Sequence, residues 1–251
     1  MSATTKDLYD EASHDWRRSE PILLSDYTAR PFLLDWCEPV SKLDVLDLGC
    51  GEGYFARNLK RRGARTIFGI DVSPEMVRAA QEQEKAEHLG IEYTSGDACN
   101  LAAFAADSFD LVVAVFLFNY LDLQQTRHTM REVHRVLRPG GRFVFAVPHP
   151  SLAFLGEKCA PFYFEPGSHG YFSGRDVTFE GRIWRRDGKS VPVRSVHKTL
   201  GDYIASLSEA GFRRMPMLAE LHVTEQHLAL DPEWFGPLRE KPLHLAFQLT
   251  K

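Results

Sequence analysis

The sequence lacks the features of several large protein classes. Its 251 residues contain no apolar run of the roughly 18 residues that are needed to span a membrane. The opening stretch, MSATTKDLYDEASHDW, has no apolar segment of the kind found in secretory signals. No repeat or low-complexity tract is present either. We therefore expect a cytoplasmic protein with no membrane partner.

Cysteine is scarce and widely spaced. None of the four cysteines, Cys37, Cys50, Cys99 and Cys159, takes part in a C-x-x-C pair of the kind that holds zinc. Reduced thiols in a cytosol are the simplest interpretation. The sequence also shows no compact set of carboxylates near the motifs described below. We therefore predict no metal site.

A surplus of positive charge is also missing. The net charge is −4 and the isoelectric point is about 6.2, whereas nucleic-acid binders usually carry a basic excess. One basic cluster, formed by Lys60, Arg61, Arg62 and Arg65, fits the solvated end of a helix, where cations suit the helix dipole. We expect no nucleic-acid partner, and the sequence does not indicate an oligomeric state.

The sequence does contain a long alternation of strand and helix patterns, from Leu43 to Gln248. The segment FDLVVAVFLF, residues 109–118, is apolar almost throughout, which is typical of a strand covered on both faces of a parallel sheet. Alternating units of this kind predict a mostly parallel sheet with helices on both faces. The expected strands are residues 45–48, 66–71, 91–98 (with the loop), 109–118, 142–148, 213–221 and 243–249, and the expected helices are 54–62, 73–88, 126–141 and 199–211.

The alternation breaks between His149 and about Val196. This segment is aromatic, rich in glycine and irregular, and it ends in VTFEGRIWRRDGKSVPVRSV, where Asp187-Gly188 is a strong turn signal. We expect a β-hairpin there. The insert is too short to bury much of a core by itself, so we interpret it as a cap over one edge of the sheet rather than as a separate domain.

The stretch VLDLGCGEGYF, residues 45–55, has glycines at positions 49, 51 and 53. A strand that enters a helix through glycines exposes free backbone N–H groups to a ligand. The G-x-G-x-G spacing differs from the G-x-G-x-x-G pattern of dinucleotide sites, since Tyr54 stands where the third glycine would be, and no GK[ST] follows. Neither a pyrophosphate nor a triphosphate site is therefore predicted.

This glycine motif resembles the first motif of class I S-adenosylmethionine-dependent methyltransferases. The downstream segments GIDVSPEMV, SGDA, FDLVVAVFLFNYL and LRPGGRFVFAVPHP resemble later parts of the same fold, and the likeness covers roughly Leu43 to Pro150. HKTLGDYIASLSEAGF and PLHLAFQL resemble the end of that fold. Small-molecule enzymes of the ubiquinone-methyltransferase type are the most similar kind.

The resemblance implies a role for each polar position of these motifs. The backbone at Gly49, Gly51 and Gly53 would serve the amino-acid end of S-adenosylmethionine. Asp47 would face its ammonium group, and Asp71 would accept both ribose hydroxyls.

The adenine end of the cofactor would meet a second group of residues. Asp97 and the Ala98 N–H would read the adenine edge, while Val72, Met76 and Phe116 would pack against the ring. Met76 and Phe116 also suit a plain core position, and that alternative stays open.

The resemblance further implies an N-terminal helix that folds over the methionine end of the cofactor. Tyr9 and Trp16 fit that role by position, or they only pack the helix down. Arg17, Arg18 or Arg30 would reach the cofactor carboxylate, and the sequence does not choose among them.

The acceptor is expected at the carboxyl ends of the strands. His149 follows the fifth strand directly and is a candidate general base, although His149-Pro150 also suits a simple turn and many acceptors need no base. Weaker candidates are Tyr120, His169, His197 and His222. Aromatic residues of the insert suggest a pocket for an apolar or aromatic acceptor, or a small core of the cap itself: Phe162, Tyr163, Phe164, Tyr171 and Phe172.

Together these observations predict an α/β fold: a doubly wound, mostly parallel seven-stranded sheet with helices on both faces, an N-terminal helical lid and an inserted cap with a hairpin after the fifth strand. The parts are the lid (1–42), the cofactor-binding core (43–148), the acceptor-site cap (149–198) and the C-terminal helix with the last two strands (199–251).

The resemblance implies an enzyme that moves a methyl group from S-adenosylmethionine to a small, aromatic or apolar molecule by in-line displacement, with S-adenosylhomocysteine as product. The alternatives are an RNA or protein methyltransferase, or a binding module for the cofactor without catalysis. A different reaction on the same fold is also compatible with the sequence.

Overall fold

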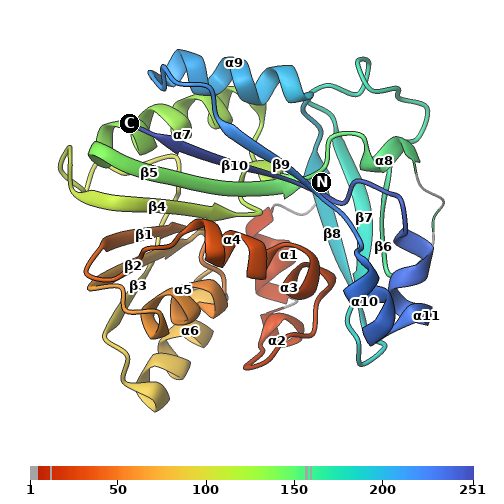
Figure 1. Ribbon diagram of the computed structural model, residues 1–251, viewed down its shortest axis with the longest axis horizontal. Helices are drawn as coiled ribbons and strands as arrows, with labels where there is room; N and C mark the ends of the chain where they lie inside the picture. The colour runs from red at the N-terminus through yellow and green to blue at the C-terminus, as the bar shows by residue number, and fades with distance from the viewer. Residues whose placement is uncertain (1–4, 12, 156–157, 159) are drawn as a thin grey trace.

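Seven strands form one sheet in the order β3-β2-β1-β4-β5-β10-β9 (Figure 1). The structure is a computed structural model that describes residues 5–11, 13–155, 158 and 160–251, so Cys159 lies outside the described residues. Strands β1 to β5 run parallel, whereas β10 lies antiparallel between β5 and β9. The predicted seven-stranded α/β sheet is confirmed. The strands are β1 (Asp44–Leu48), β2 (Thr66–Asp71), β3 (Ile91–Ser95), β4 (Phe109–Val115), β5 (Leu137–Pro148), β9 (Met217–Leu221) and β10 (His244–Thr250).

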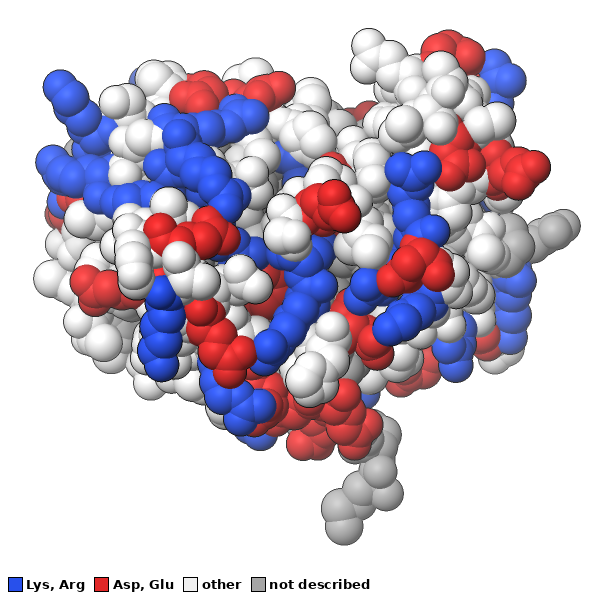
Figure 2. Space-filling view, turned by 90° about the horizontal axis from the view of Figure 1, so that it is seen from below, with Lys and Arg blue, Asp and Glu red and all other residues white. Residues whose placement is uncertain are grey.

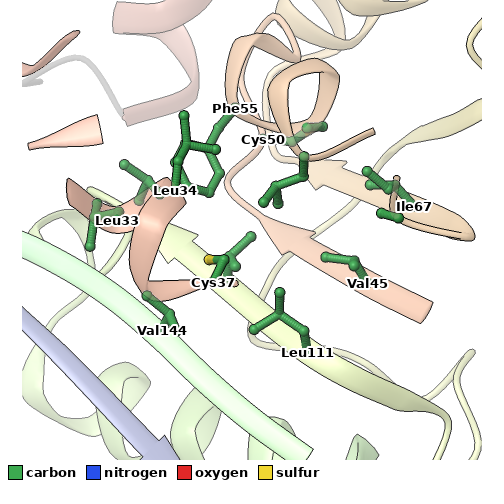
Figure 3. Close-up of a cluster of buried hydrophobic side chains, with 14 of the residues drawn as sticks. Leu33, Leu34, Cys37, Val45, Cys50, Phe55, Ile67, Leu111 and Val144 are labelled. Carbon is green, nitrogen blue, oxygen red and sulfur yellow. The ribbon is translucent and has the colours of Figure 1, made fainter. Parts of the chain in front are cut away.

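Helices cover both faces of this sheet, as Figure 1 shows. Successive strand residues point to opposite faces, so Val45 packs toward the face of α4, α5 and α6, and Leu46 packs toward the face of α7 and α9. Figure 3 shows the first of these layers, where Leu34 and Phe55 meet the strand side chains. The helices are α4 (Arg30–Trp36), α5 (Tyr54–Arg61), α6 (Pro74–Glu87), α7 (Leu123–Val136) and α9 (Leu200–Ala210).

Two predicted helix boundaries are confirmed by their caps. The Ser73 hydroxyl accepts a hydrogen bond from the Met76 N–H at 3.1 Å, as expected of an N-cap. At the other end of the chain, Thr199 caps α9, and Gly211 ends that helix with a φ of 106°.

Two other predicted boundaries are wrong. The helix expected to reach Gly140-Gly141 ends at Val136, and Leu137 already belongs to β5. Pro139 lacks an N–H and pushes the residue before it out of the helical region, so the strand begins earlier than the glycines suggest. The fourth strand also stops early, at Val115, because Phe116 has a φ of 63° that no strand residue adopts.

The cap contains the predicted hairpin and one further strand. Strands β6 (Phe162–Glu165), β7 (Thr178–Trp184) and β8 (Ser190–Val196) form a second, antiparallel sheet. Short helices that the sequence pattern did not predict pack on this sheet in one apolar cluster. They come from both ends of the chain and from the insert itself, and they include α3 (Leu24–Thr28), α8 (Leu152–Leu155), α10 (Glu225–Leu230), α11 (Pro232–Phe235) and the single-turn η2 (Gly236–Leu238).

The remaining short elements lie near the carboxyl ends of the parallel strands. They are α1 (Thr5–Glu11), α2 (Ser13–Trp16) and η1 (Phe118–Tyr120). Within the described part of the chain, no helix has both the length and the apolar character needed to cross a bilayer.

Candidate active site

One large cavity of about 400 Å³ lies among the core loops, the N-terminal helices and the cap. Its volume is in the range of small-ligand sites. Eleven of the twelve residues predicted to bind the cofactor, the undecided arginines aside, line it together: Tyr9, Trp16, Asp47, Gly49, Gly51, Asp71, Val72, Met76, Asp97, Ala98 and Phe116. Gly53 and His149 are not among its lining residues.

The loop after β1 presents its backbone to this cavity. The N–H groups of Gly49 and Cys50 donate to the Ile70 carbonyl, at 2.8 and 3.0 Å, which ties the loop to the end of β2. Gly51 has a φ of 55°, and a Cβ placed on it would meet no atom within 4 Å. A side chain at this position would therefore protrude into the cavity, whereas glycine leaves the backbone open to a ligand.

Gly53 serves the loop in a different way. It precedes α5 with a φ of 83°, and a Cβ there would come within 2.4 Å of the Tyr93 hydroxyl. This glycine is therefore required by the packing of the turn, and it does not reach the cavity itself.

Two carboxylates line the cavity next to the glycine loop. Asp71 accepts hydrogen bonds from the Gly51 and Ser73 N–H groups, at 2.8 and 2.9 Å, and burial raises its pKa. Asp47 is 1% exposed, and its Oδ2 has no partner among the described residues. Burial, and then the charge of Asp71, raise the pKa of Asp47 to about 7. A buried carboxylate oxygen without a partner fits a cationic group of a ligand.

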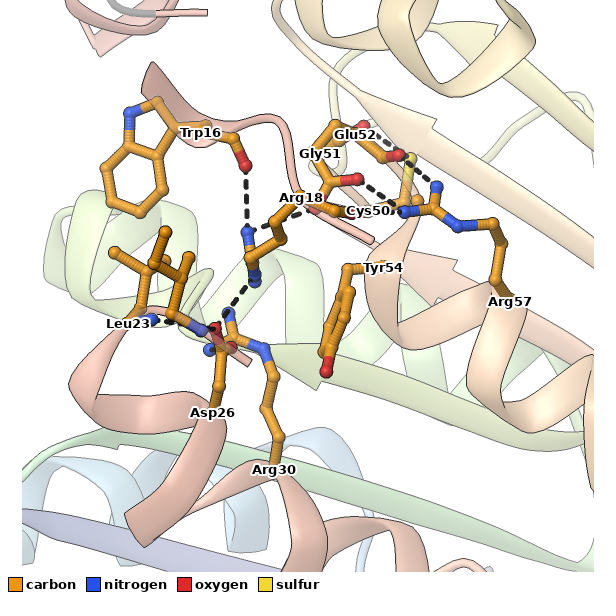
Figure 4. Close-up of polar contacts among 12 residues, drawn as sticks. Trp16, Arg18, Leu23, Asp26, Arg30, Cys50, Gly51, Glu52, Tyr54 and Arg57 are labelled. Atoms are coloured by element: carbon orange, nitrogen blue, oxygen red, sulfur yellow. Dashed lines mark hydrogen bonds and ion pairs between the residues drawn. The ribbon is translucent and has the colours of Figure 1, made fainter. Parts of the chain in front are cut away.

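Arginines surround the same end of the cavity (Figure 4). Arg18 and Arg30 both pair with the buried Asp26 at 3.0 Å, and Glu52 pairs with Arg18 at 3.0 Å and with Arg57 at 2.7 Å. Arg57 also approaches Glu87 at 3.6 Å, so these three guanidinium groups face three carboxylates.

The geometry separates the three arginines that the sequence left open. Arg17 pairs with Glu82 at 2.9 Å and does not line the cavity. Arg18 lines it, but its guanidinium is already held by Trp16, Asp26 and Glu52. Arg30 uses only Nη1, for Ser25 and Asp26, so its Nε and Nη2 make no hydrogen bond within the described residues. Arg30 is therefore the arginine available to a ligand carboxylate.

The N-terminal helices close one side of the cavity. The hydroxyls of Tyr9 and Tyr120 are hydrogen-bonded, and the Trp16 ring lies 5.3 Å from that of Tyr9. Asp10 accepts a hydrogen bond from the Ser73 hydroxyl at 2.6 Å, which fastens α1 to the loop after β2. The lid expected from the sequence thus lies over residues of the cofactor-binding core.

His149 does not lie where the sequence analysis expected it. Its Nε2 pairs with Glu220 at 2.9 Å, and its Nδ1 accepts a hydrogen bond from the Ser151 N–H at 3.1 Å. Pro148, one residue earlier, lines the cavity. Since successive residues of a strand end point to opposite sides, the side chain of His149 is turned away. Of the weaker candidates, Tyr120 lines the cavity and His169, His197 and His222 do not.

The cap supplies the apolar part of the cavity. Phe162 and Phe164 of β6 line it, and the alternation along the strand turns Tyr163 outward. Tyr171 and Phe172 also lie outside it, and Phe172 is 80% exposed. The sequence patterns assign no role to several further lining residues, above all Ile183, Val193, Asn119 and His244.

Ion pairs hold the three arginines of the basic cluster noted in the sequence. Arg61 pairs with Glu87, Arg62 with Asp35 and Arg65 with Asp44. Figure 2 shows acidic side chains interspersed among basic ones on the face that it displays. In the part of the chain that the structure describes, no three His, Cys, Asp or Glu side chains are grouped so that they could hold a metal ion.

Comparison with known proteins identifies the architecture. The profile of a family described as "Methyltransferase domain" matches residues 45–141, which include the glycine loop and both aspartates. An S-adenosylmethionine-dependent methyltransferase from Mesorhizobium loti superposes with a TM-score of 0.67 at 26% identity, over 88% of this chain and 96% of that one.

The names of curated relatives refer to different methyl acceptors. A ubiquinone biosynthesis O-methyltransferase of Ralstonia nicotianae is 26% identical over 171 residues, which are 65% of this chain and 71% of that protein. A ribosomal protein L11 methyltransferase of Burkholderia ambifaria is 33% identical over 115 residues, which are 45% of this chain but only 35% of that protein. Because one relative is named for a protein acceptor, these matches do not decide between small and macromolecular acceptors.

Proposed function

Because this chain is a class I S-adenosylmethionine-dependent methyltransferase, we propose that it is a cytoplasmic enzyme that methylates a small, aromatic or apolar molecule. The observation that carries the proposal is the division of the cavity into two halves. One half, around the glycine loop, is charged and polar, and the other, under the cap, is apolar. The polar half suits the cofactor and is also called the cofactor half. The apolar half suits the acceptor and is also called the acceptor half.

The polar half fits the amino-acid end of S-adenosylmethionine. Asp47, with its unpartnered buried oxygen, would take the ammonium group, and the free N–H groups of Arg30 would take the carboxylate. The open backbone at Gly51 leaves room for this part of the ligand. Asp71, at the end of β2, would accept the ribose hydroxyls.

The adenine ring would lie against the wall of the cavity that the ends of β3 and β4 form. Asp97 and Ala98 follow β3, and Phe116 follows β4 in its left-handed conformation. Met76 is buried in the first turn of α6, and Val72 is 42% exposed beside it. These side chains would enclose the ring from two sides, while Asp97 and the Ala98 N–H offer hydrogen bonds to its edge.

The apolar half would hold the acceptor. Phe162, Phe164, Ile183 and Val193 come from all three strands of the cap sheet and line the cavity. Burial of an apolar or aromatic molecule against such a surface contributes about 25 cal/mol per Å². A charged or strongly polar acceptor would lose its hydration here without compensation.

The bound cofactor supplies a methyl group that is already activated for substitution, so the protein contributes alignment and exclusion of water. Tyr9 and Trp16 cover the polar half, and the cap covers the apolar half. Closure from both sides would hold the acceptor's nucleophile, the methyl carbon and the sulfur in line.

Two alternative functions remain for experiment. The name of the Burkholderia relative favours a protein acceptor, and a module that only binds the cofactor would need no acceptor half. The roof that the cap sheet forms over the cavity argues for a small acceptor, because a folded macromolecule could not enter beneath it.

The test is methyl transfer from radiolabelled S-adenosylmethionine to separate pools of phenols, amines and small acids, with ribosomal protein and RNA as parallel arms. We expect label in an organic-soluble product of at least one small-molecule pool, with S-adenosylhomocysteine formed in equal amount. Label only in protein or RNA would show a macromolecular acceptor. Tight cofactor binding without transfer to any pool would support the binding module.

A further inference from the structure

His244 is a buried histidine in the wall of the acceptor half. It is the first residue of β10, pairs with Pro148 across the sheet and is 2% exposed. Its ring lies 5.0 Å from that of Phe116 and 6.3 Å from that of Phe162. It therefore stands between a residue of the cofactor half and a residue of the cap.

The hydrogen bonds of Thr28 fix the tautomer of this histidine. The Thr28 hydroxyl donates its single hydrogen to the Leu24 carbonyl at 3.0 Å. The same oxygen lies 3.0 Å from the His244 Nε2, so it can only accept there. The Nε2 of His244 therefore carries the hydrogen, and its Nδ1 carries a lone pair.

That Nδ1 lone pair has no partner among the described residues. Burial lowers the pKa of His244 to about 3, and the neighbouring Arg30 and His149 lower it further in the same direction. The imidazole is thus neutral across the physiological range, and Nδ1 remains an acceptor. A buried acceptor without a donor costs free energy until a ligand supplies one.

We propose that His244 Nδ1 accepts a hydrogen bond from the hydroxyl group that receives the methyl, which makes the acceptor a phenol or an enol. The inference rests on the proposed function and names the acceptor group for the same cavity. Because Nδ1 can only accept, the methylated group must bring a hydrogen. A tertiary amine, a thioether or a carboxylate does not meet this condition.

The charges around the cavity favour a hydroxyl over an amine. Among the residues that the structure describes, every carboxylate that lines the cavity belongs to the cofactor half: Asp47, Glu52, Asp71 and Asp97. The Arg30 guanidinium lies over the Phe116 ring at 5.4 Å, at the border of the acceptor half. An aliphatic amine is protonated at neutral pH and would find no lining carboxylate in the acceptor half among the described residues, whereas a neutral hydroxyl needs none.

The hydrogen bond also gives the proton a destination. As the oxygen–carbon bond forms and the carbon–sulfur bond breaks, the oxygen becomes strongly acidic and its proton passes to Nδ1. The products are the neutral ether, neutral S-adenosylhomocysteine and an imidazolium that still donates from Nε2 to Thr28. Because the proton comes from so strong an acid, even a weakly basic imidazole can take it. Release of the proton to water restores the starting tautomer.

The test compares phenols with the hydrocarbons that lack the hydroxyl. Phenol is paired with benzene and 2-naphthol with naphthalene, and each is titrated into the full chain saturated with S-adenosylhomocysteine. Saturation with this product is measured first and separately. We expect the phenol of at least one pair to bind at least tenfold more tightly than its hydrocarbon, as one buried hydrogen bond warrants.

Two substitutions of the same residue make a matched control. In His244→Gln the amide reaches the position of Nε2 and can still bond Thr28, but it leaves no acceptor at the position of Nδ1. In His244→Asn the amide oxygen can occupy the Nδ1 position. We expect the preference for the phenol to vanish in the glutamine variant and to persist in part in the asparagine variant, with binding of S-adenosylhomocysteine unchanged in both.

A spectroscopic readout is independent of any acceptor. The ¹⁵N shifts of His244 should show a neutral ring with hydrogen on Nε2 at pH 7, and Thr28→Val should disturb that tautomer. A hydrogen on Nδ1, or equal binding of phenol and hydrocarbon in every pair, would overturn the inference and leave the proposed function standing. Failure of S-adenosylhomocysteine to bind would instead overturn the proposed function.

Discussion

Replacing Asp71 with alanine is expected to weaken binding of S-adenosylmethionine by about 100-fold, since two charge-assisted hydrogen bonds contribute roughly 3 kcal/mol or more. The carboxylate would hold the ribose hydroxyls, and it also accepts hydrogen bonds from the N–H groups of Gly51 and Ser73. Its loss therefore removes a ligand contact and loosens the loop that shapes the cavity. Isothermal calorimetry measures the change directly.

Asp71→Asn is the matched control. Asparagine keeps one carbonyl oxygen and the shape of the side chain but removes the charge, so we expect a smaller loss of affinity than in the alanine variant. Circular dichroism and thermal unfolding establish that both variants fold. Unchanged affinity in a folded Asp71→Ala protein would show that the second strand does not hold the ribose.

Cofactor affinity should also depend on pH through Asp47. The pKa of this carboxyl is raised to about 7 by burial and by the charge of Asp71; of the smaller effects, Arg30 lowers this pKa and Glu52 raises it. A cationic ammonium binds the ionised form. Below pH 7 the Asp47 carboxyl of the ligand-free protein is protonated, and binding of the cofactor must release this proton. The affinity should therefore fall as the pH is lowered, with a limiting loss of about tenfold per pH unit.

The measurement is calorimetry at pH 5.5, 6.5 and 7.5 in buffers of different ionisation enthalpy. In the native protein we expect release of nearly one proton at the lowest pH and little at the highest. Asp47→Asn, which has the same shape and no titration, should bind weakly at every pH and release no proton. The same pH slope in this variant would assign the linkage to another group, such as Asp71.

The cofactor half of the cavity could be predicted because its residues belong to local motifs. Asp47 and Gly51 lie in one strand-loop-helix unit, and Asp71 ends the next strand along the chain, so each motif carries its own geometry. Parallel order then brings the carboxyl ends together at one edge of the sheet. Their contacts with the cofactor remain predictions.

The acceptor half could not be predicted because it depends on distant parts of the chain. Thr28 and His244 are 216 residues apart in the sequence, and nothing in PLHLAFQL distinguishes this histidine from a residue that merely begins a strand. The choice of Arg30 over its neighbours rests on which N–H groups other side chains already occupy. Such pairing is a property of the folded chain.

The errors at strand ends have a local cause. A shift of one residue turns a side chain to the opposite face of a strand, and that was enough to misplace His149 relative to Pro148. The early start of β5 depended on Pro139 rather than on the more conspicuous glycines that follow it. Hydrophobic pattern alone does not resolve either boundary.

Binding of the cofactor in this cavity is tested most directly by a calorimetric titration of the full chain with S-adenosylhomocysteine, with NAD titrated in parallel. We expect one site for S-adenosylhomocysteine, binding that is weakened in Asp71→Ala and Asp47→Asn, and no heat from NAD. Binding of NAD at this site, or S-adenosylhomocysteine affinity that neither substitution changes, would contradict this expectation.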